Sequence, residues 1–302
     1  MAKSILIPSF AKINLFLDII CKRPDGYHNI ETVFQTIDLH DDVSLELRPS
    51  GLKIECDDPS VPSDSSNLAA KAFSALRPAL NYEGGVRITL RKRIPPGSGL
   101  GGGSSNAAAV LKGLKCLFQE QVSEQFLMET ARQLGADVPF FLFGGLAAGW
   151  GKGERLERIS PLPASFLVVA VPAGVSVSTA LAYGKVRAPQ CAGPPPAELS
   201  GCSESLKTFL KALDPSLPLS ANASAIQLLY NELEEPALGM FPEIGRLKNR
   251  MLEAGAKAAL MTGSGSAVFG IADSLSHAQR IRSKLEASCP CRGFTVSTIN
   301  GR

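Results

Sequence analysis

Residues 97–103 read GSGLGGG, and Ser104, Ser105 and Asn106 follow at the start of a run of helix-forming residues. A glycine-rich segment that opens a helix can close its backbone amides around a phosphate, and the helix dipole favours the same negative charge. No acidic residue occurs from 94 to 119, so no nearby carboxylate opposes such an anion. The chemistry expected of this segment is phosphate binding.

Three kinds of nucleotide-binding protein use glycine loops, and two of them fit poorly. A Walker A loop ends in GKS or GKT and a protein kinase carries HRD and DFG, but this sequence has none of these. The dinucleotide-binding fingerprint GxGxxG is matched from Gly97 to Gly102, with Glu120 near the acidic spacing. That fingerprint needs a strand running up to its acidic residue, whereas 104–134 predicts two successive helices. A dinucleotide-dependent oxidoreductase is therefore kept only as a less favoured alternative.

Lysine and aspartate could supply the remaining chemistry of a phosphoryl transfer, which needs a base and a cation beside the reacting oxygens. Residues 9–20 alternate between apolar and polar types, which predicts a half-buried strand with Lys12 and Asn14 adjacent on its less apolar face. Asp137 lies in GADVPFF, between a helix end and an apolar helix start. Both residues also have an ordinary structural role open to them, Lys12 on a solvated strand face and Asp137 as a helix cap.

The elements that must position these residues are helices and strands in mixed order. We expect helices from Asn67, from Ser104 and over 123–135, the last ending at Gly135 in a left-handed cap. A new strand begins near 166, and two short strands flank a glycine turn at 263–265. Residues 185–203 are rich in Pro, Gly, Ala and Ser, which predicts a long mobile surface loop. The pattern indicates an α+β protein with an N-terminal domain over 1–158 and a C-terminal domain over 159–302.

Composition excludes several function classes. The formal net charge is only +3 and the basic residues are scattered, which argues against a nucleic-acid partner. The longest apolar stretch is too short and too rich in glycine to span a bilayer, and no signal peptide is visible. Seven cysteines with no CxxC pair predict neither a disulfide framework nor a zinc site. We therefore expect a cytoplasmic protein.

The glycine loop resembles the ATP-phosphate loop of the GHMP small-molecule kinases. AKINLFLDIICKRPDGYHNIETVFQTIDLHD, GADVPFFLFGG and TGSGSAVFG stand in the matching order around it, so that the resemblance runs from about residue 8 to about residue 270. Within this superfamily the motifs are most similar to the kinases that act on 4-diphosphocytidyl-2-C-methyl-D-erythritol. The resemblance implies a two-domain α+β GHMP kinase fold with the active site in the cleft between the domains. It also implies transfer of a phosphoryl group from ATP, with Mg²⁺, to the 2-hydroxyl of that substrate in non-mevalonate isoprenoid synthesis.

The resemblance assigns roles residue by residue. Asp137 becomes the catalytic base and Lys12 the residue that orients the acceptor hydroxyl. The substrate set is Asn14, Tyr27, His28 and Tyr183, with the cytosine stacked between Tyr27 and Tyr183 and hydrogen-bonded by His28. The ATP set is Asn67, Lys92, Gly99, Gly101, Gly102, Gly103, Ser104 and Asn106. Gly263, Ser264 and Gly265 are expected to pack a second turn against the site, and Ser105 is a candidate ligand of Mg²⁺.

Two alternatives within the superfamily stay open at this point. A homoserine or mevalonate type of kinase would share the fold, but RPDGYHNIETVFQ argues against it because those substrates offer no base to stack. A catalytically silent relative would share the fold too, and the presence of both Lys12 and Asp137 argues against it. A monomer and a homodimer are equally compatible with the sequence.

Overall fold

The computed structural model describes residues 3–118 and 122–300, and the chain forms two compact units. Unit 1 holds the chain up to Ala11, Leu39–Pro96 and Gly101–Phe143; unit 2 holds Lys12–Asp38, Gly97–Leu100 and the chain from Gly144 onward. The units alternate along the sequence because strands β1 (Ser4–Lys22) and β2 (His28–Arg48) each contribute residues to both. These units group residues by their contacts and are discontinuous in sequence, whereas the sequence analysis expected one boundary after residue 158. That boundary stays a prediction.

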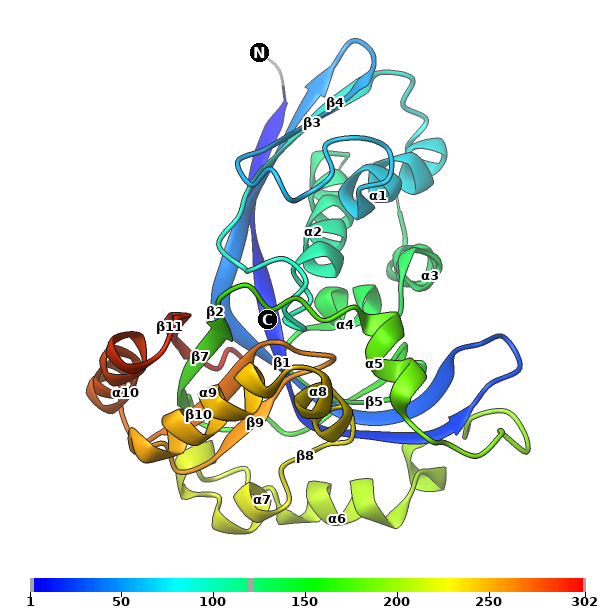
Figure 1. Cartoon of the computed structure of the whole chain (residues 1–302). Helices are drawn as coiled ribbons and strands as arrows, with labels where there is room; N and C mark the ends of the chain where they lie inside the picture. Colours follow the sequence, from blue (N-terminus) through cyan, green and yellow to red (C-terminus); the bar gives the residue numbers. More distant parts are fainter. Residues whose placement is uncertain (1–2, 119–121, 301–302) are drawn as a thin grey trace. The chain divides into compact units, whose positions relative to one another are not determined.

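Unit 1 is a small sheet covered by helices. Strand β4 (Gly85–Arg91) pairs antiparallel with β2 and parallel with β3 (Leu52–Cys56). The helices of this unit pack on one another beside the sheet (Figure 1); they are α1 (Leu68–Leu76), the 3-10 turn η1 (Arg77–Leu80), α2 (Gly102–Leu117), α3 (Glu124–Leu134) and α4 (Val138–Phe143). Gly113 lets α2 approach the sheet closely, because a Cβ there would lie under 3.0 Å from the side chains of Ile7 and Leu45.

The helix ends of unit 1 confirm some sequence predictions and correct others. The side chain of Asn67 caps α1 by accepting a hydrogen bond from Ala69 N at 2.9 Å. Helix α2 begins at Gly102 rather than at Ser104, because Gly101 takes a left-handed conformation, with φ 75°, as the N-cap. The predicted left-handed cap at Gly135 is wrong, since this residue has an extended φ of 168°. Glu120, the acidic residue of the dinucleotide fingerprint, lies outside the described residues.

Unit 2 is built on an antiparallel sheet in the order β11-β7-β10-β9. Its strands are β7 (Phe166–Pro172), β9 (Ala259–Met261), β10 (Val268–Ala272) and β11 (Cys291–Ser297). This confirms the predicted strand near 166 and the two strands around the second glycine turn. Helices α9 (Pro242–Glu253) and α10 (Leu275–Ser288) pack on this sheet, as Figure 1 shows, and bury an apolar core that includes Leu247, Met251 and Ile281.

The other elements of unit 2 adjoin β1 and β2. Strand β5 (Leu146–Gly151) pairs antiparallel with β2 and with β6 (Arg155–Arg158), and β8 (Tyr230–Asn231) pairs parallel with β1. The remaining helices are α5 (Thr179–Lys185), η2 (Leu199–Gly201), α6 (Glu204–Ala212), η3 (Leu219–Ala221), α7 (Ala223–Gln227) and α8 (Glu234–Met240). Across the described parts of the chain, each helix is too short or too polar to cross a membrane.

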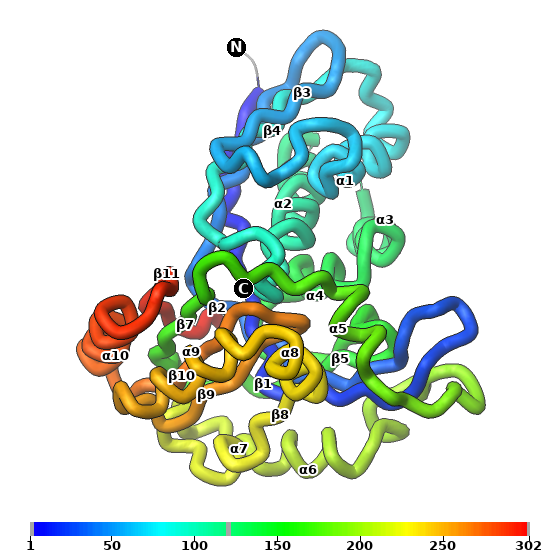
Figure 2. Tube along the Cα trace, viewed as in Figure 1, coloured from blue at the N-terminus to red at the C-terminus, as the bar shows by residue number. Residues whose placement is uncertain are grey.

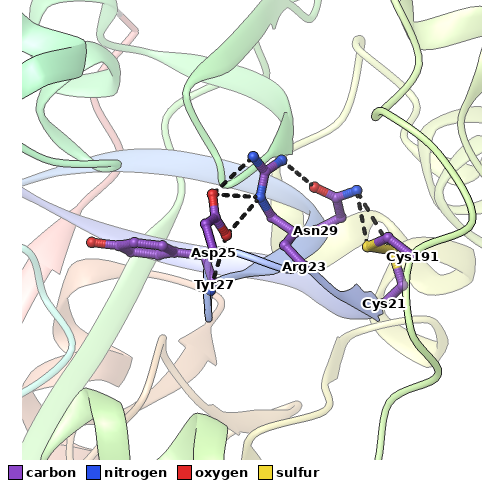
Figure 3. Close-up of a disulfide and its surroundings, with 6 residues drawn as sticks. All are labelled: Cys21, Arg23, Asp25, Tyr27, Asn29 and Cys191. Atoms are coloured by element: carbon purple, nitrogen blue, oxygen red, sulfur yellow. Dashed lines mark hydrogen bonds and ion pairs between the residues drawn. A yellow bond between two sulfur atoms is a disulfide. The ribbon is translucent and has the colours of Figure 1, made fainter.

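The prediction about cysteines is wrong, because Cys21 and Cys191 form a disulfide across 170 residues of sequence. The backbone pairs at the same place: Lys22 N donates to Pro189 O at 2.7 Å, and Cys191 N donates to Lys22 O at 2.9 Å. Residues 189–196, here called the strap, therefore lie along the end of β1 (Figure 2). The 185–203 segment, predicted to be mobile, is tied to unit 2 by these bonds and by the disulfide (Figure 3).

Candidate active site

Lys12 and Asn14 lie side by side on β1, as the strand alternation predicts. Lys12 Nζ donates a hydrogen bond to Asn14 Oδ1 at 2.7 Å. The expectation of a half-buried strand is wrong, however, because every residue from Ala11 to Leu17 is buried. The polar face of β1 is covered by other parts of unit 2, so the ammonium group and the amide sit inside the protein and need partners there.

Two threonines that sequence reasoning missed supply those partners. Thr262 Oγ1 accepts from Asn14 N at 2.9 Å and donates to Asn14 Oδ1 at 3.2 Å. Thr32 Oγ1 accepts from Asn14 Nδ2 at 2.8 Å and donates to the carbonyl oxygen of Phe16 at 2.6 Å. Both threonines are fully buried. The only signal in the sequence was that each lies within a motif already singled out, Thr32 in RPDGYHNIETVFQ and Thr262 at the start of TGSGSAVFG, and neither motif suggested a link to Asn14.

The part of the glycine loop that belongs to unit 2 packs against the second glycine turn. Gly99 has φ 80°, and a Cβ on it would lie under 3.0 Å from the carbonyl oxygen of Thr262. A Cβ on Gly263 would lie 2.9 Å from Gly99 O and 3.1 Å from Lys12 Nζ. Backbone bonds join the same segments, with Ala267 N donating to Ser98 O at 3.0 Å. The expected packing of the second turn on the loop is thus observed, and glycine is required at both contacts.

A buried asparagine holds the second turn in place. Asn231 Nδ2 donates to the carbonyl oxygens of Met261 and Gly263 at 2.8 and 2.9 Å, and its Oδ1 accepts from Leu233 N. The side chain is 4% exposed. This residue was not among the sequence candidates, because a lone asparagine in LLYNELEE carries no distinctive pattern.

The part of the loop that belongs to unit 1 forms the beginning of α2. Ser105 N donates to Gly101 O at 2.9 Å, which makes Gly101 the first carbonyl of the helix. The first amides of any helix lack a partner within it, and here they come from residues 102–104, with no acidic side chain in the first turn. Gly103 is exposed and Gly102 and Ser104 are half-buried. These amides suit an anion such as the phosphates of a nucleotide.

Lys92 and Asn106 occupy a buried polar network of unit 1. Lys92 Nζ forms an ion pair with Asp41 and donates to Asn106 Oδ1 at 3.0 Å. Asn106 Nδ2 in turn donates to Ser9 Oγ and to Asp41 Oδ2, each at 2.9 Å. Asp41 is fully buried and the Lys92 side chain is 5% exposed. These contacts give both residues a structural role, so their assignment to the ATP set stays a prediction.

Ser105, the predicted ligand of Mg²⁺, is engaged within the fold. Its side chain is buried, and its Oγ donates to the carbonyl oxygen of Phe10 at 2.6 Å and accepts from Ser9 Oγ at 2.7 Å. A hydroxyl engaged in this way keeps only one lone pair for a metal ion, and its assignment as a ligand stays a prediction. Among the described residues, no group of three or more His, Cys, Asp or Glu side chains could hold a metal ion.

Asn67 and Asp137 both stand at the beginnings of helices in unit 1. Asn67 caps α1 and also donates from Nδ2 to Pro62 O at 2.6 Å, so its amide is engaged in the fold. Asp137 directly precedes α4, and its side chain is half-buried. A carboxylate at this position faces the positive end of the α4 backbone.

Three aromatic residues of unit 2 were singled out in the sequence: Tyr27 and His28, which follow the Asp25–Gly26 turn, and Tyr183 of α5. The rings of His28 and Tyr183 lie 5.4 Å apart at an angle of 32°. Tyr27 is 59% exposed, with Lys152 Nζ 4.8 Å from its ring centre. Burial, together with the nearby charge of Lys22, lowers the pKa of His28 below its ordinary 6.5. A neutral imidazole offers one donor and one acceptor, which suits the edge of a pyrimidine base.

The comparisons with known proteins connect these features to a family. Residues 67–145 match the GHMP kinases N terminal domain, and residues 210–291 match the GHMP kinases C terminal model. A 4-diphosphocytidyl-2-C-methyl-D-erythritol kinase of Synechococcus sp. is 42% identical over 287 residues, which cover 95% of this chain and 91% of the relative. The chain belongs to the 4-diphosphocytidyl-2-C-methyl-D-erythritol kinase family.

Solved structures agree with this assignment. A crystal structure of a 4-(cytidine 5'-diphospho)-2C-methyl-D-erythritol kinase superposes with a TM-score of 0.76 at 37% identity, covering 98% of this chain and all of that one. Homoserine kinase from Cytophaga hutchinsonii shares the fold, with a TM-score of 0.71 at 21% identity over 98% of this chain and 95% of its own. The predicted GHMP kinase fold is therefore confirmed. Membership of the diphosphocytidyl-methylerythritol kinase family removes the oxidoreductase alternative and disfavours the homoserine and mevalonate types.

Proposed function

We propose that this protein transfers the γ-phosphoryl group of ATP to the 2-hydroxyl of 4-diphosphocytidyl-2-C-methyl-D-erythritol, giving the 2-phosphate and ADP, a step of non-mevalonate isoprenoid synthesis. The observation that carries this proposal is the 37–42% identity to kinases of that name along nine-tenths of the chain. The buried Lys12–Asn14 pair, the packed rings of His28 and Tyr183, and the exposed Tyr27 supply chemistry that suits this substrate.

Lys12 and Asp137 are proposed to act on the acceptor hydroxyl. Asp137 accepts the hydroxyl proton as the oxygen bonds to the γ-phosphorus and the bond to the β–γ bridging oxygen breaks. Lys12 steadies the negative charge on the attacking oxygen and on the transferring group. The hydrogen bond from Lys12 Nζ to Asn14 supports this role, because it fixes the ammonium group in a water-poor setting where its charge acts strongly.

The triphosphate is proposed to bind the backbone of the glycine loop. The amides at the beginning of α2 and the left-handed turns at Gly99 and Gly101 supply donors without side chains in the way. Mg²⁺ is proposed to arrive as part of its complex with ATP, bound by phosphate oxygens and water, since Ser105 is committed to the fold. Asn67, Lys92 and Asn106 remain predicted contributors near the nucleotide.

The cytosine is proposed to stack between Tyr27 and Tyr183 and to hydrogen-bond His28. The exposure of Tyr27 supports this role, because a large aromatic residue that is 59% exposed offers apolar surface to a ligand. Asn14 is proposed to contact the same substrate near its hydroxyl groups. This arrangement gives a basis for choosing a cytidine-linked alcohol over an acceptor without a base.

Phosphorus NMR of the product tests the proposal. Purified protein with ATP, Mg²⁺ and 4-diphosphocytidyl-2-C-methyl-D-erythritol should give ADP and a new phosphomonoester signal, and Asp137→Asn should lose the signal while still binding ATP. Turnover by Asp137→Asn at the wild-type rate would refute the assignment of the base. An active site in a cleft between the domains, a cytoplasmic location, and a monomer or homodimer all stay predictions.

A further inference from the structure

The orientation of the Asn14 amide depends on a residue that has no assigned role. The hydroxyl of Thr32 has a single proton, which it donates to the carbonyl oxygen of Phe16 at 2.6 Å. It can therefore only accept from Asn14, and the partner 2.8 Å away must be the NH₂ group of the amide. The other end of the amide, Oδ1, then points to Lys12 Nζ.

The reverse orientation of the amide would be unfavourable. It would place the NH₂ group against the ammonium group of Lys12, donor against donor, and would face the carbonyl oxygen toward a threonine that has no proton to give. Asn14, Thr32 and Thr262 are all fully buried, so water does not compensate for either mismatch. The amide is thus held in one state by the threonine hydroxyl.

We propose that Thr32 is a positioning residue for phosphoryl transfer, acting on Lys12 through Asn14. The chain of contacts runs from Phe16 O to Thr32, then to Asn14 and to Lys12, within unit 2. Its effect is to keep the lysine ammonium group where the charge of the transition state develops. This inference rests on the proposed function, because it assumes that Lys12 acts in the reaction.

The test replaces the hydroxyl by a methyl group of nearly the same size. Thr32→Val should lower kcat about tenfold, the effect of losing one buried hydrogen bond at the reacting centre, and leave KM for ATP within about twofold. Thr32→Ser, which restores the hydroxyl, should recover most of kcat. Thr36→Val is the matched control: Thr36 lies on the same strand, is 6% exposed and accepts a hydrogen bond from Gly145 N, but does not contact Asn14.

The outcomes separate this inference from the proposed function. A wild-type protein without turnover on the cytidine substrate would refute the proposed function itself. An active wild type with equal kcat in Thr32→Val and Thr36→Val would refute only the role of Thr32. Failure of Thr32→Ser to recover kcat would refute it as well. If Thr32→Val does not fold, Thr32→Ala removes the same hydroxyl without filling its space, and an unchanged kcat there overturns the inference.

A separate observation concerns the disulfide. Asn29 Nδ2 lies 3.5 Å from Cys21 Sγ and 3.4 Å from Cys191 Sγ, and Asn29 Oδ1 accepts from Arg23 NH1 at 3.0 Å. Arg23 forms an ion pair with Asp25 at 3.0 Å. Asp25 Oδ1 accepts from Tyr27 N at 3.2 Å. Figure 3 shows this continuous series of contacts from the sulfur atoms to the backbone amide of Tyr27.

The same disulfide is open to small reagents. Both cysteines are half-buried, and Cys21 lines a cavity of about 200 Å³ together with Asn29, Trp150 and residues 192–196 of the strap. Trp150, the single tryptophan of the chain, donates from Nε1 to Pro196 O at 2.9 Å. The strap is therefore held by the disulfide and two backbone bonds to Lys22 at one end, and by Trp150 and Arg155, which both donate to Pro196 O, at the other.

We infer that the Cys21–Cys191 bond is a redox-sensitive clamp on the Tyr27 side of the proposed cytidine site. A dithiol would reduce it in two steps. One thiolate of the dithiol attacks a sulfur of the bond, which forms a mixed disulfide with one cysteine and releases the other cysteine as a thiol. The second thiolate then attacks the reductant's sulfur in the mixed disulfide and displaces the cysteine still bound there, which leaves two cysteine thiols and the cyclic disulfide of the reductant. Loss of the bond would let the strap and Asn29 move. Asn29 would then no longer hold Arg23, and Arg23 would no longer hold Asp25 against the backbone of Tyr27.

Dithiothreitol titration of the native protein tests this clamp. Alkylation and mass spectrometry measure how far the bond is reduced. Reduction should shift the fluorescence of Trp150 and raise KM for the cytidine substrate at least roughly fivefold, while kcat is retained. The double variant Cys21→Ser, Cys191→Ser should match the reduced protein and ignore dithiothreitol. Cys289→Ser, a control at a free cysteine whose Sγ lies 3.9 Å from that of Cys291, should respond as wild type does.

Each contrary outcome refutes the clamp. Complete reduction without a change in Trp150 fluorescence would show that the strap does not depend on the bond, and this reading requires no enzymatic activity. Reduction that releases the strap but leaves KM unchanged would show that Tyr27 is positioned without it. A disulfide that dithiothreitol does not reduce in the folded protein would also overturn the inference.

Discussion

Substituting Gly99 tests the contact between the glycine loop and the second glycine turn. Gly99→Ala places a methyl group under 3.0 Å from the carbonyl oxygen of Thr262, whereas ordinary contact begins at 3.4 Å, so that the backbone must shift by roughly 1 Å. The left-handed φ of 80° adds a conformational cost of about 1–2 kcal/mol for any residue with a Cβ. Overpacking adds about 1–3 kcal/mol, for a total loss of about 2–5 kcal/mol of stability.

Gly174→Ala is the matched control for this substitution. Gly174 has φ 74° and belongs to the same unit, but a Cβ there meets nothing within 4 Å, so only the conformational cost applies. The thermal unfolding midpoint of Gly99→Ala should fall about twice as far as that of Gly174→Ala, and only Gly99→Ala should raise KM for ATP. Equal midpoints with an unchanged KM for ATP would refute the proposed link between loop packing and nucleotide binding.

Three further predictions concern buried charge, pH and aromatic stacking. Asp41→Ala should lower the free energy of unfolding by about 3–5 kcal/mol, because it leaves Lys92 buried without its counter-ion. Glu124→Ala, the control, removes an 83% exposed partner of Lys115 and should lower it by under about 1 kcal/mol. Equal losses in the two variants would contradict the argument from burial. The folded state lowers the pKa of His28, so the unfolded chain takes up this proton first as pH falls. Thermal melts from about pH 7 to about pH 5 should therefore show wild type losing stability relative to His28→Gln, and parallel curves would be inconsistent with a buried neutral imidazole. Tyr183→Ala should raise KM for the cytidine substrate about tenfold, the effect of one lost stacking partner, while Tyr183→Phe should keep it near wild type; an equal rise in both would argue against stacking.

The polar pair on β1 shows what strand periodicity can and cannot predict. Alternation was enough to place Lys12 beside Asn14, since residues two apart share a face of a strand, and the two side chains are in fact 2.7 Å apart. The burial of that face was not predictable, because Thr32 and Thr262 come from 18 and 248 residues away. Local pattern carries no information about such distant partners.

The strap shows where predictions from composition fail. Its prolines and glycines predicted mobility, and an odd number of cysteines predicted no disulfide. Both inferences used averages over many proteins, whereas the outcome depends on one pairing across 170 residues. Similarly, the resemblance assigned Lys92 to the ATP set, and nothing in the local sequence predicted that Asp41 holds it inside the unit. Long-range ion pairs and disulfides are set by the folded chain, which single-sequence patterns do not encode.

The measurement that tests the central claim most directly is ADP release by the wild-type protein with ATP and Mg²⁺ and each of three acceptors in turn. The account predicts ADP formation with 4-diphosphocytidyl-2-C-methyl-D-erythritol and only background with homoserine or mevalonate. ADP formation with homoserine or mevalonate at a rate equal to or above that with the cytidine substrate would contradict it, because Tyr27, His28 and Tyr183 would then not select the acceptor.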